Sequence, residues 1–245
     1  MDRLLELQTH ELEDTHWWYR GRRRVIAELL GRVALPAGAE ILDAGCGSGR
    51  NMVDLARLGT VTGVEIADAS VARARERRVG EVVQCSITEL PFSDAQFDLA
   101  VSFDVIEHID DQIRALAELH RVVRPGGTLV VTVPAYQWLW SEHDVINHHE
   151  RRYTARTLIA PAEQAGWRAV RTTYFNGFLL PVAVVHRRLT RRSRLVGEPV
   201  SDLERTPERL NTVLEWPLRL EARAIGMGWR IPAGLSVAGV FSKPA

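Results

Sequence analysis

The chain is expected to adopt an α/β fold in which a doubly wound parallel sheet is flanked by helices. Short apolar runs alternate with segments of helical spacing along residues 38–135, as in parallel strands joined by helices. The first of these runs passes directly into a turn with three glycines. With 245 residues, 46% of them hydrophobic and 25% charged, the chain can bury one sizeable core.

The first strand is predicted around residues 41–44, directly before Gly45, Gly47 and Gly49. Glycines allow the positive φ values of a tight turn and let a ligand approach the backbone closely. A helix over 50–58 would point its N-terminus at this turn. We interpret the turn as a nucleotide cradle, although a glycine turn between strand and helix also arises from chain geometry alone.

The second predicted strand, 60–65, ends in Glu65, which lies 22 residues after Asp43. At this spacing, α/β nucleotide sites place an acid on the ribose hydroxyls. Further strands are expected at 80–86, 96–103 and within 124–134, with a helix over 111–123 before the last of them.

These segments carry an ordered set of motifs: L-D-A-G-C-G-S-G at 42–49, V-E at 64–65, L-P-F at 90–92, F-D-L-A-V-S-F-D-V-I-E-H-I at 97–109 and R-V-V-R-P-G-G-T-L at 121–129. In this order the chain resembles the class I methyltransferases that use S-adenosylmethionine and release S-adenosylhomocysteine. The resemblance implies a Rossmann-like sheet of seven strands with the last strand antiparallel. A dinucleotide oxidoreductase is the rival interpretation, but Arg50 stands where its third glycine belongs.

The resemblance also implies roles for matched positions. Asp43 and Gly45 would flank the methionine part of the cofactor, Gly47 and Gly49 would admit it closely, and Glu65 would hold the ribose.

Three further positions are assigned to the cofactor, and two of them depart from the family pattern. Many relatives carry an acid for the adenine amino group where this chain has Ser86 and Ile87. The Ser86 hydroxyl and the Ile87 N–H are expected to replace it, and a hydroxyl is the weaker partner. Asp104, after the fourth strand, is also assigned to the cofactor. Glu107 and His108 are expected in the pocket wall or as the cap of the next helix.

Residues 1–37 are expected to form an N-terminal helical cap. An aromatic and cationic stretch over 15–26 leads into its helix. Tyr19 could cover the methionine arm and Arg22 could pair with its carboxylate. The alternative is a core-packing tryptophan pair with solvated arginines.

After the fifth strand, residues 135–154 concentrate histidines, acids and aromatics at the edge where such sheets bind ligands. We expect the methyl acceptor there, with His143 beside Asp144 as the first candidate for a general base and His148 as the second. Structural roles within a lid are the alternative. A metal site built from this stretch is not expected, because adjacent His148 and His149 cannot share a helix face.

Strands at 166–174 and 235–241 correspond to the hairpin that the family forms at the sheet edge. About sixty residues intervene here, whereas hairpin partners normally lie close in sequence. The expected division is a cofactor-binding domain over 38–174 and 235–245, with an inserted helical subdomain over 175–234. An apolar stretch followed by arginines 187, 188, 191, 192 and 194 leaves three roles open: a cap on the acceptor pocket, a homodimer contact, or contact with a membrane or phosphorylated lipid.

The charge balance gives no general attraction for nucleic acid, since Lys plus Arg and Asp plus Glu each total 31. Asp104-Val105-Ile106 also departs from the Asn-Pro-Pro-Tyr type of motif found in nucleobase methyltransferases of this superfamily. Two cysteines and the lack of an export signal favour the cytoplasm.

The expected activity is methyl transfer from S-adenosylmethionine to an oxygen or nitrogen of a small-molecule acceptor in specialised or sugar-linked metabolism. The alternatives are a lipid-linked or peptide acceptor, and a non-catalytic scaffold that retains the cofactor fold.

Overall fold

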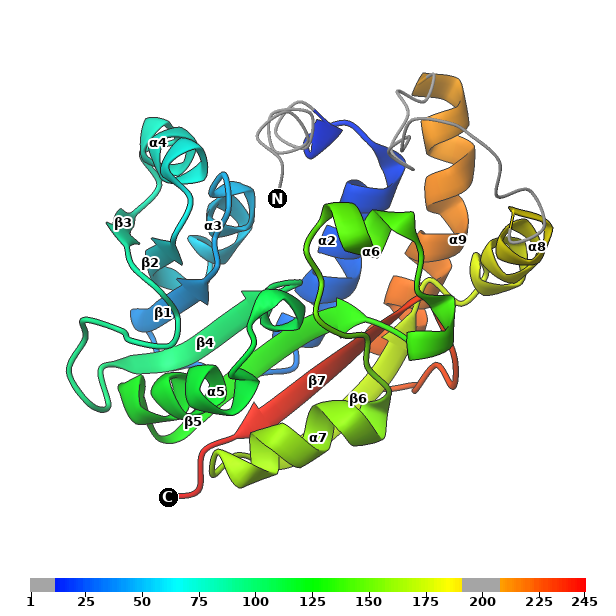
Figure 1. Ribbon diagram of the computed structural model, residues 1–245. Coiled ribbons are helices and arrows are strands. Elements are labelled where there is room, and N and C mark those ends of the chain that lie inside the picture. Colours follow the sequence, from blue (N-terminus) through cyan, green and yellow to red (C-terminus); the bar gives the residue numbers. More distant parts are fainter. Residues whose placement is uncertain (1–11, 191–207) are drawn as a thin grey trace.

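The computed structural model describes residues 12–190 and 208–245 and confirms the predicted fold class (Figure 1). A seven-stranded sheet has the order β3-β2-β1-β4-β5-β7-β6. Strand β7 is antiparallel to both of its neighbours, while the pairs among β1 to β5 are parallel. The strands are β1 (Ala39–Ala44), β2 (Gly59–Glu65), β3 (Glu81–Gln84), β4 (Phe97–Phe103), β5 (Val123–Pro134), β6 (Arg168–Phe175) and β7 (Ser236–Ser242).

Helices cover both faces of the sheet, as a doubly wound topology requires. The helices are α2 (Trp17–Leu30), α3 (Arg50–Leu55), α4 (Asp68–Glu76), α5 (Gln112–Val122), α6 (Glu142–Ile146), α7 (Ala155–Gln164), α8 (Leu180–Thr190) and α9 (Glu208–Gly226), with short 3-10 turns η1 (Ile106–His108) and η2 (Gln137–Leu139). In Figure 1, α5 and α7 lie on one face of the sheet and α2, α3 and α9 on the other.

Alternate residues of the central strands face these two layers. Ile41 packs in the cluster formed with α2, α3 and α4, whereas Leu42 packs in the cluster formed with α5 and α7. Five of the six residues of β1 are buried, as expected for a central strand of a parallel sheet that is covered on both faces. Because β1 is parallel to β2 and to β4, the carboxyl ends of these three strands lie at one edge of the sheet.

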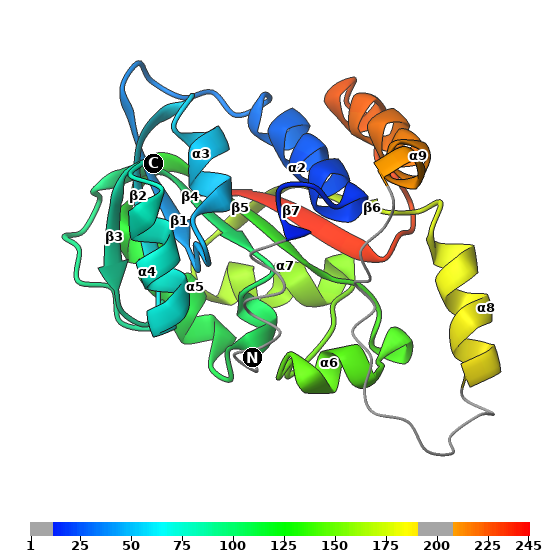
Figure 2. The ribbon, with the colours of Figure 1, turned by 90° about the horizontal axis from the view of Figure 1, so that it is seen from above.

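The N-terminal helix and the last helix of the insertion pack together on the sheet. Helices α2 and α9 lie side by side in both views (Figures 1 and 2). A Cβ on Gly21 would come within 2.2 Å of the Leu218 side chain, so glycine permits this close approach. The Trp17 N–H donates to Asn211 Oδ1 at 3.0 Å, and Glu215 forms ion pairs with Arg20 and Arg24.

The remainder of the insertion is described only in part. Helix α8 extends away from the sheet in Figure 2. Arginines 191, 192 and 194 lie outside the described residues, as do the side chains of Arg187 and Arg188. In the described parts of the chain, no helix has both the length and the apolar composition needed to cross a bilayer. The proposed domain division and the homodimer remain predictions.

Several predicted boundaries shift in the structure. The helix after the glycine turn stops at Leu55 instead of residue 58, and the third strand spans only Glu81–Gln84. Helix α7, which was not predicted from the sequence, begins at a capping box in which Thr154 and Thr157 satisfy each other's backbone N–H groups.

Candidate active site

The three glycines of the turn after β1 serve different physical purposes. All have positive φ, at 81°, 54° and 77° for Gly45, Gly47 and Gly49. A Cβ on Gly45 would come within 2.4 Å of the Val105 side chain, and one on Gly49 within 3.1 Å of Ala74. A Cβ on Gly47 would meet no atom within 4 Å among the described residues. Gly45 and Gly49 thus permit close packing, while Gly47 faces space that a ligand can fill.

Glu65, which its spacing assigns to the ribose, lies beside this space, and the assignment itself remains a prediction. Its Oε2 accepts a hydrogen bond from the Gly47 N–H at 2.9 Å, and its Oε1 accepts from Ile66 and Ala67 at 2.8 and 3.0 Å. These bonds fix the half-buried carboxylate at the end of β2. Each carboxylate oxygen offers about two lone-pair sites, so Glu65 keeps capacity for ribose hydroxyls.

Asp43 is the buried acid at the end of β1. Its exposure is 1%, and neither of its side-chain oxygens has a hydrogen-bond partner among the described residues. Burial raises the pKa of Asp43 to about 7, Arg22 opposes this shift and Glu65 adds to it. A buried carboxylate without a donor is costly in isolation. A cationic ligand such as the ammonium of a bound amino acid would satisfy it.

Arg22 and Asp104 join helix α2 to the end of β4. Arg22 approaches Asp104 Oδ2 at 2.9 Å, and its guanidinium lies 5.6 Å from the Trp18 ring centroid. The Nε of Arg22 is buried and has no acceptor among the described residues, so it can still donate to a carboxylate. Tyr19 packs edge-on against Trp18, with ring centroids 5.0 Å apart. Both predicted cap residues therefore belong to an aromatic and cationic cluster on α2.

The predicted adenine partners lie after β3. The Ser86 hydroxyl is 2.8 Å from that of Thr88 and accepts the Thr88 N–H at 3.2 Å, while the Ile87 side chain is buried in the core. Ser86 thus shapes a local turn in addition to any role with a base.

One contact at the turn was not predicted from the sequence. The Ser48 hydroxyl donates to Glu13 at 2.6 Å, and Arg77 pairs with the same carboxylate. Glu13 therefore fastens the segment before α2 to the glycine turn. Acidic residues are abundant in the chain, and nothing in the spacing of Glu13 distinguished it.

The histidine-rich segment is organised around Asp144. This fully buried carboxylate accepts from Arg152 at 2.6 Å and lies 2.8 Å from His149 Nδ1. Burial alone would raise the pKa of Asp144, but its bonds to His149 and Arg152 hold it below the usual range. His148 is exposed with φ of 54°, and the His143 side chain is not among those described. Asp144 thus stabilises the segment, and the catalytic assignments of His143, Asp144 and His148 remain predictions.

Two ionisable residues at the same edge of the sheet, Glu107 and His108, have shifted pKa values. Burial is the main cause that raises the pKa of Glu107, which is fully buried on η1, and the nearby Asp104 carboxylate adds to this shift. Burial is the main cause that lowers the pKa of His108 to about 4, and the neighbouring His149 contributes to this shift. The rings of His108 and His149 meet edge to face, with centroids 4.6 Å apart. The structure therefore joins η1 to the segment after α6, across about forty residues of sequence.

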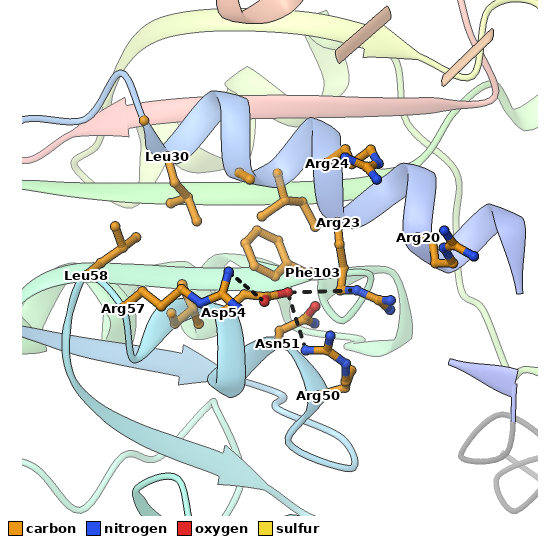
Figure 3. Close-up of a pocket in the computed structure, with 14 residues that line it drawn as sticks. Arg20, Arg23, Arg24, Leu30, Arg50, Asn51, Asp54, Arg57, Leu58 and Phe103 are labelled. Atoms are coloured by element: carbon orange, nitrogen blue, oxygen red, sulfur yellow. Dashed lines mark hydrogen bonds and ion pairs between the residues drawn. The ribbon is translucent and has the colours of Figure 1, made fainter. Parts of the chain in front are cut away.

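A separate cavity of about 420 Å³ opens between α2 and α3 (Figure 3). Arg23, Arg50 and Arg57 converge on Asp54 at its rim. Leu30, Leu55 and Phe103 contribute apolar lining. None of the predicted cofactor residues lines this cavity, so we do not assign the nucleotide to it.

Comparisons with known proteins agree with this geometry. Residues 42–131 match the family model described as a methyltransferase domain. A protein of Mycolicibacterium smegmatis named "Probable S-adenosylmethionine-dependent methyltransferase" is 36% identical over 163 residues, 64% of this chain and 61% of its own length. The 27-O-demethylrifamycin SV methyltransferase of Amycolatopsis mediterranei is 32% identical over 117 residues, 44% of this chain and 43% of its own length. The chain thus spans less than two thirds of these relatives.

Solved structures share the fold at low identity. A chain from the complex with the Haloferax volcanii Trm112 methyltransferase activator has a TM-score of 0.64 and 18% identity, and the match covers 97% of this chain and 94% of that one. The [4+2]-cyclase SpnF has a TM-score of 0.61 and 20% identity, covering 93% and 84%. A cyclase catalyses a reaction other than methyl transfer, so the fold does not by itself fix the chemistry.

The sheet order, the open turn at Gly47 and the acids at the ends of β1 and β2 define an α/β domain built for a nucleotide cofactor. The buried Asp43 carboxylate also fits a ligand that carries an amino-acid group. The family match thus identifies residues 42–131 as a class I methyltransferase domain, of the kind that uses S-adenosylmethionine.

Proposed function

We propose that the protein transfers a methyl group from S-adenosylmethionine to a small-molecule acceptor, most readily at an oxygen. The observation that carries this proposal is the unpartnered Asp43 carboxylate, among the described residues, beside the open turn at Gly47. An isolated buried carboxylate favours a cationic ligand, and the open turn favours one that contacts the backbone. S-adenosylmethionine combines these properties and, when bound, supplies an electrophilic methyl group on its sulfonium.

The residues around the turn then divide the work of binding. Asp43 accepts hydrogen bonds from the amino group, and Arg22 donates to the carboxylate of the same amino-acid arm. Glu65, held by the Gly47 N–H, accepts from the ribose hydroxyls. The rigid ends of β1 and β2 keep these groups in place, and alignment of the reacting atoms is the main contribution expected from the protein.

The acceptor is expected beyond the end of β5, where aromatic rings gather. Tyr136 stacks on Tyr174 with centroids 5.2 Å apart, and on Trp138 at 5.5 Å. Trp138 is 59% exposed, so a flat face is offered to solvent at this edge. Such a face favours an aromatic or otherwise apolar acceptor. The names of relatives that act as O-methyltransferases favour an oxygen as the methylated atom.

A hydroxyl acceptor benefits from a base, and His143 and His148 remain the proposed candidates. A lipid-linked or peptide acceptor is the second candidate, supported by exposed Phe178 and Val182 near the start of α8. A non-catalytic scaffold that binds the cofactor would keep Asp43 and Gly47 as well, so methyl transfer itself distinguishes it from the enzyme.

The test is a methyl-transfer assay with isotopically labelled S-adenosylmethionine and a panel of phenols, hydroxylated polyketides, sugars and acyl carboxylates, read by mass spectrometry. We expect one acceptor class to gain a methyl group, and Gly47→Val to abolish the gain. Cofactor binding without transfer to any acceptor of this panel would favour the scaffold.

A further inference from the structure

Three potential metal ligands meet at the acceptor edge of the sheet. Glu107 and His108 are adjacent on η1, and His149 follows α6. One ligand atom from each lies within 4.8 Å of those of the other two. The histidine-rich segment 135–154 contains His149 but neither Glu107 nor His108. The fold brings these two residues to His149, which no spacing along the chain could indicate.

Glu107 supplies an acceptor with no apparent structural use. Its exposure is 0%, and neither carboxylate oxygen has a hydrogen-bond partner within the described parts of the chain. Buried acids are ordinarily hydrogen-bonded or paired, or they coordinate a metal. This residue therefore provides an independent indication of a missing cationic partner.

Both imidazoles are oriented by a second group. The Nδ1 of His149 lies 2.8 Å from Asp144 Oδ1, and Asp144 is itself fixed by Arg152 at 2.6 and 3.0 Å. The His108 ring packs edge to face against the His149 ring, with centroids 4.6 Å apart, and this contact limits its orientation. Metal-binding histidines almost always donate their second ring N–H to a carboxylate or a backbone carbonyl, which fixes the tautomer and the direction of the ligand nitrogen.

We propose that Glu107, His108 and His149 Nε2 bind a divalent transition-metal ion. Two imidazoles and one carboxylate suit zinc, cobalt or iron, whereas magnesium and calcium prefer an all-oxygen set. Bonds of about 2.0–2.1 Å place the ligands of a tetrahedral ion about 3.4 Å apart. The cluster therefore needs only a small contraction to close on an ion. Three protein ligands leave a position open, as in catalytic rather than structural zinc sites.

The test uses the full chain without a histidine tag, stripped with a chelator and dialysed. Co²⁺ is titrated against the visible absorption of the bound ion, and Zn²⁺ and Mg²⁺ are added as competitors. We expect one Co²⁺ per chain, displaced by Zn²⁺ and not by an equal concentration of Mg²⁺. Glu107→Gln and His149→Ala should weaken binding at least tenfold.

The matched controls are His148→Ala, an exposed neighbour, and His120→Ala, a half-buried histidine that packs against Trp167. Both should bind Co²⁺ as the unaltered chain does. Absence of saturable binding in the unaltered chain, or equal affinity in Glu107→Gln and His149→Ala, would overturn the proposal. Anomalous diffraction from zinc-soaked crystals of the unaltered chain gives a second measurement that does not depend on a variant folding. Zinc elsewhere than between η1 and His149 would likewise refute it.

Discussion

At the scale of single residues, the three glycines of the turn after β1 have different roles. Two of them are required by the packing of the chain, and the third leaves space for a ligand. Gly45 and Gly49 are explained by close contacts with Val105 and Ala74, so the structure needs them whether or not a cofactor binds. Gly47 is different, because a Cβ there meets no described atom within 4 Å. Its absent side chain leaves space for a ligand, although its φ of 54° also favours glycine.

The first prediction uses this difference. Gly47→Val should abolish S-adenosylhomocysteine binding and leave the sheet folded, because the side chain would fill the space beside Glu65. The matched control is Gly38→Val: Gly38 has φ of 69° and no atom within 4 Å of a Cβ among the described residues, but it precedes β1. Calorimetry measures the binding of S-adenosylhomocysteine to both variants, and thermal melting shows whether each variant is folded. Equal loss of binding in both would assign the effect to backbone strain.

The second prediction concerns the pH dependence contributed by Asp43. In the unfolded chain this acid ionises near 3.8, and in the folded chain burial raises its pKa to about 7. Between pH 3.8 and about pH 7 the folded protein binds this proton and the unfolded chain does not. The free energy of unfolding of the unliganded protein therefore falls as the pH rises through this range, and Asp43 causes no further loss above it. Asp43→Asn should therefore raise the free energy of unfolding by about 2–4 kcal/mol at pH 8, with a smaller gain at pH 5.

The same substitution should weaken S-adenosylhomocysteine binding at least tenfold at pH 8, because the ammonium loses its carboxylate. For the unaltered chain, affinity should rise between pH 6 and 8 as Asp43 ionises. Urea titrations at the two pH values measure the stability, and calorimetry over the same range measures the affinity. If the Asp43→Asn variant binds normally and is no more stable, Asp43 has another partner.

Residues at the ends of strands could be located from the sequence, whereas residues brought together by folded loops could not. The sequence could place Asp43, Gly47 and Glu65 near one another because parallel strands and their following turns end at one edge of the sheet, while their roles toward the cofactor remain predictions. The pairing of Glu13 with Ser48, and of Asp144 with Arg152 and His149, depends on how loops fold back. Loop contacts of this kind follow no sequence period, so no spacing predicts them.

At the scale of elements, strands were predicted more reliably than helix packing. The apolar runs of the central strands are visible in the sequence because both faces of the sheet are buried. The pairing of α2 with α9 joins positions 194 residues apart, as the Trp17 to Asn211 bond shows. The sequence predicts a helical insertion over 175–234, but it does not indicate which helix lies beside α9.

The third prediction tests this packing. Gly21→Ala should lower the free energy of unfolding by about 1–3 kcal/mol, because its Cβ would lie 2.2 Å from Leu218 and overpack the contact. Leu218→Ala alone should also destabilise, since Leu218 is 1% exposed. In the double variant the clash is relieved, so its loss should be smaller than the two single losses added. Chemical denaturation of the four proteins gives the coupling; strict additivity would contradict a direct contact.

At the scale of the whole molecule, fold class and cofactor type could be predicted, but the acceptor could not. The residues proposed to bind the cofactor lie at the sheet edge, where the chain geometry repeats from one member of the fold to another. The proposed acceptor region consists of the segment after β5 and the helices of the insertion, which are assembled from distant parts of the sequence. The aromatic stack of Tyr136, Tyr174 and Trp138 shows this, since it joins β6 to the loop after β5.

The most direct test of the central claim is titration calorimetry of S-adenosylhomocysteine into the unaltered protein at pH 8. We predict saturable binding of one molecule per chain, with a dissociation constant in the micromolar range. We also predict that Gly38→Val retains this binding and Gly47→Val loses it. Absence of heat and of any thermal stabilisation by the ligand, in a protein that is folded, would contradict the assignment of the turn after β1 to this cofactor.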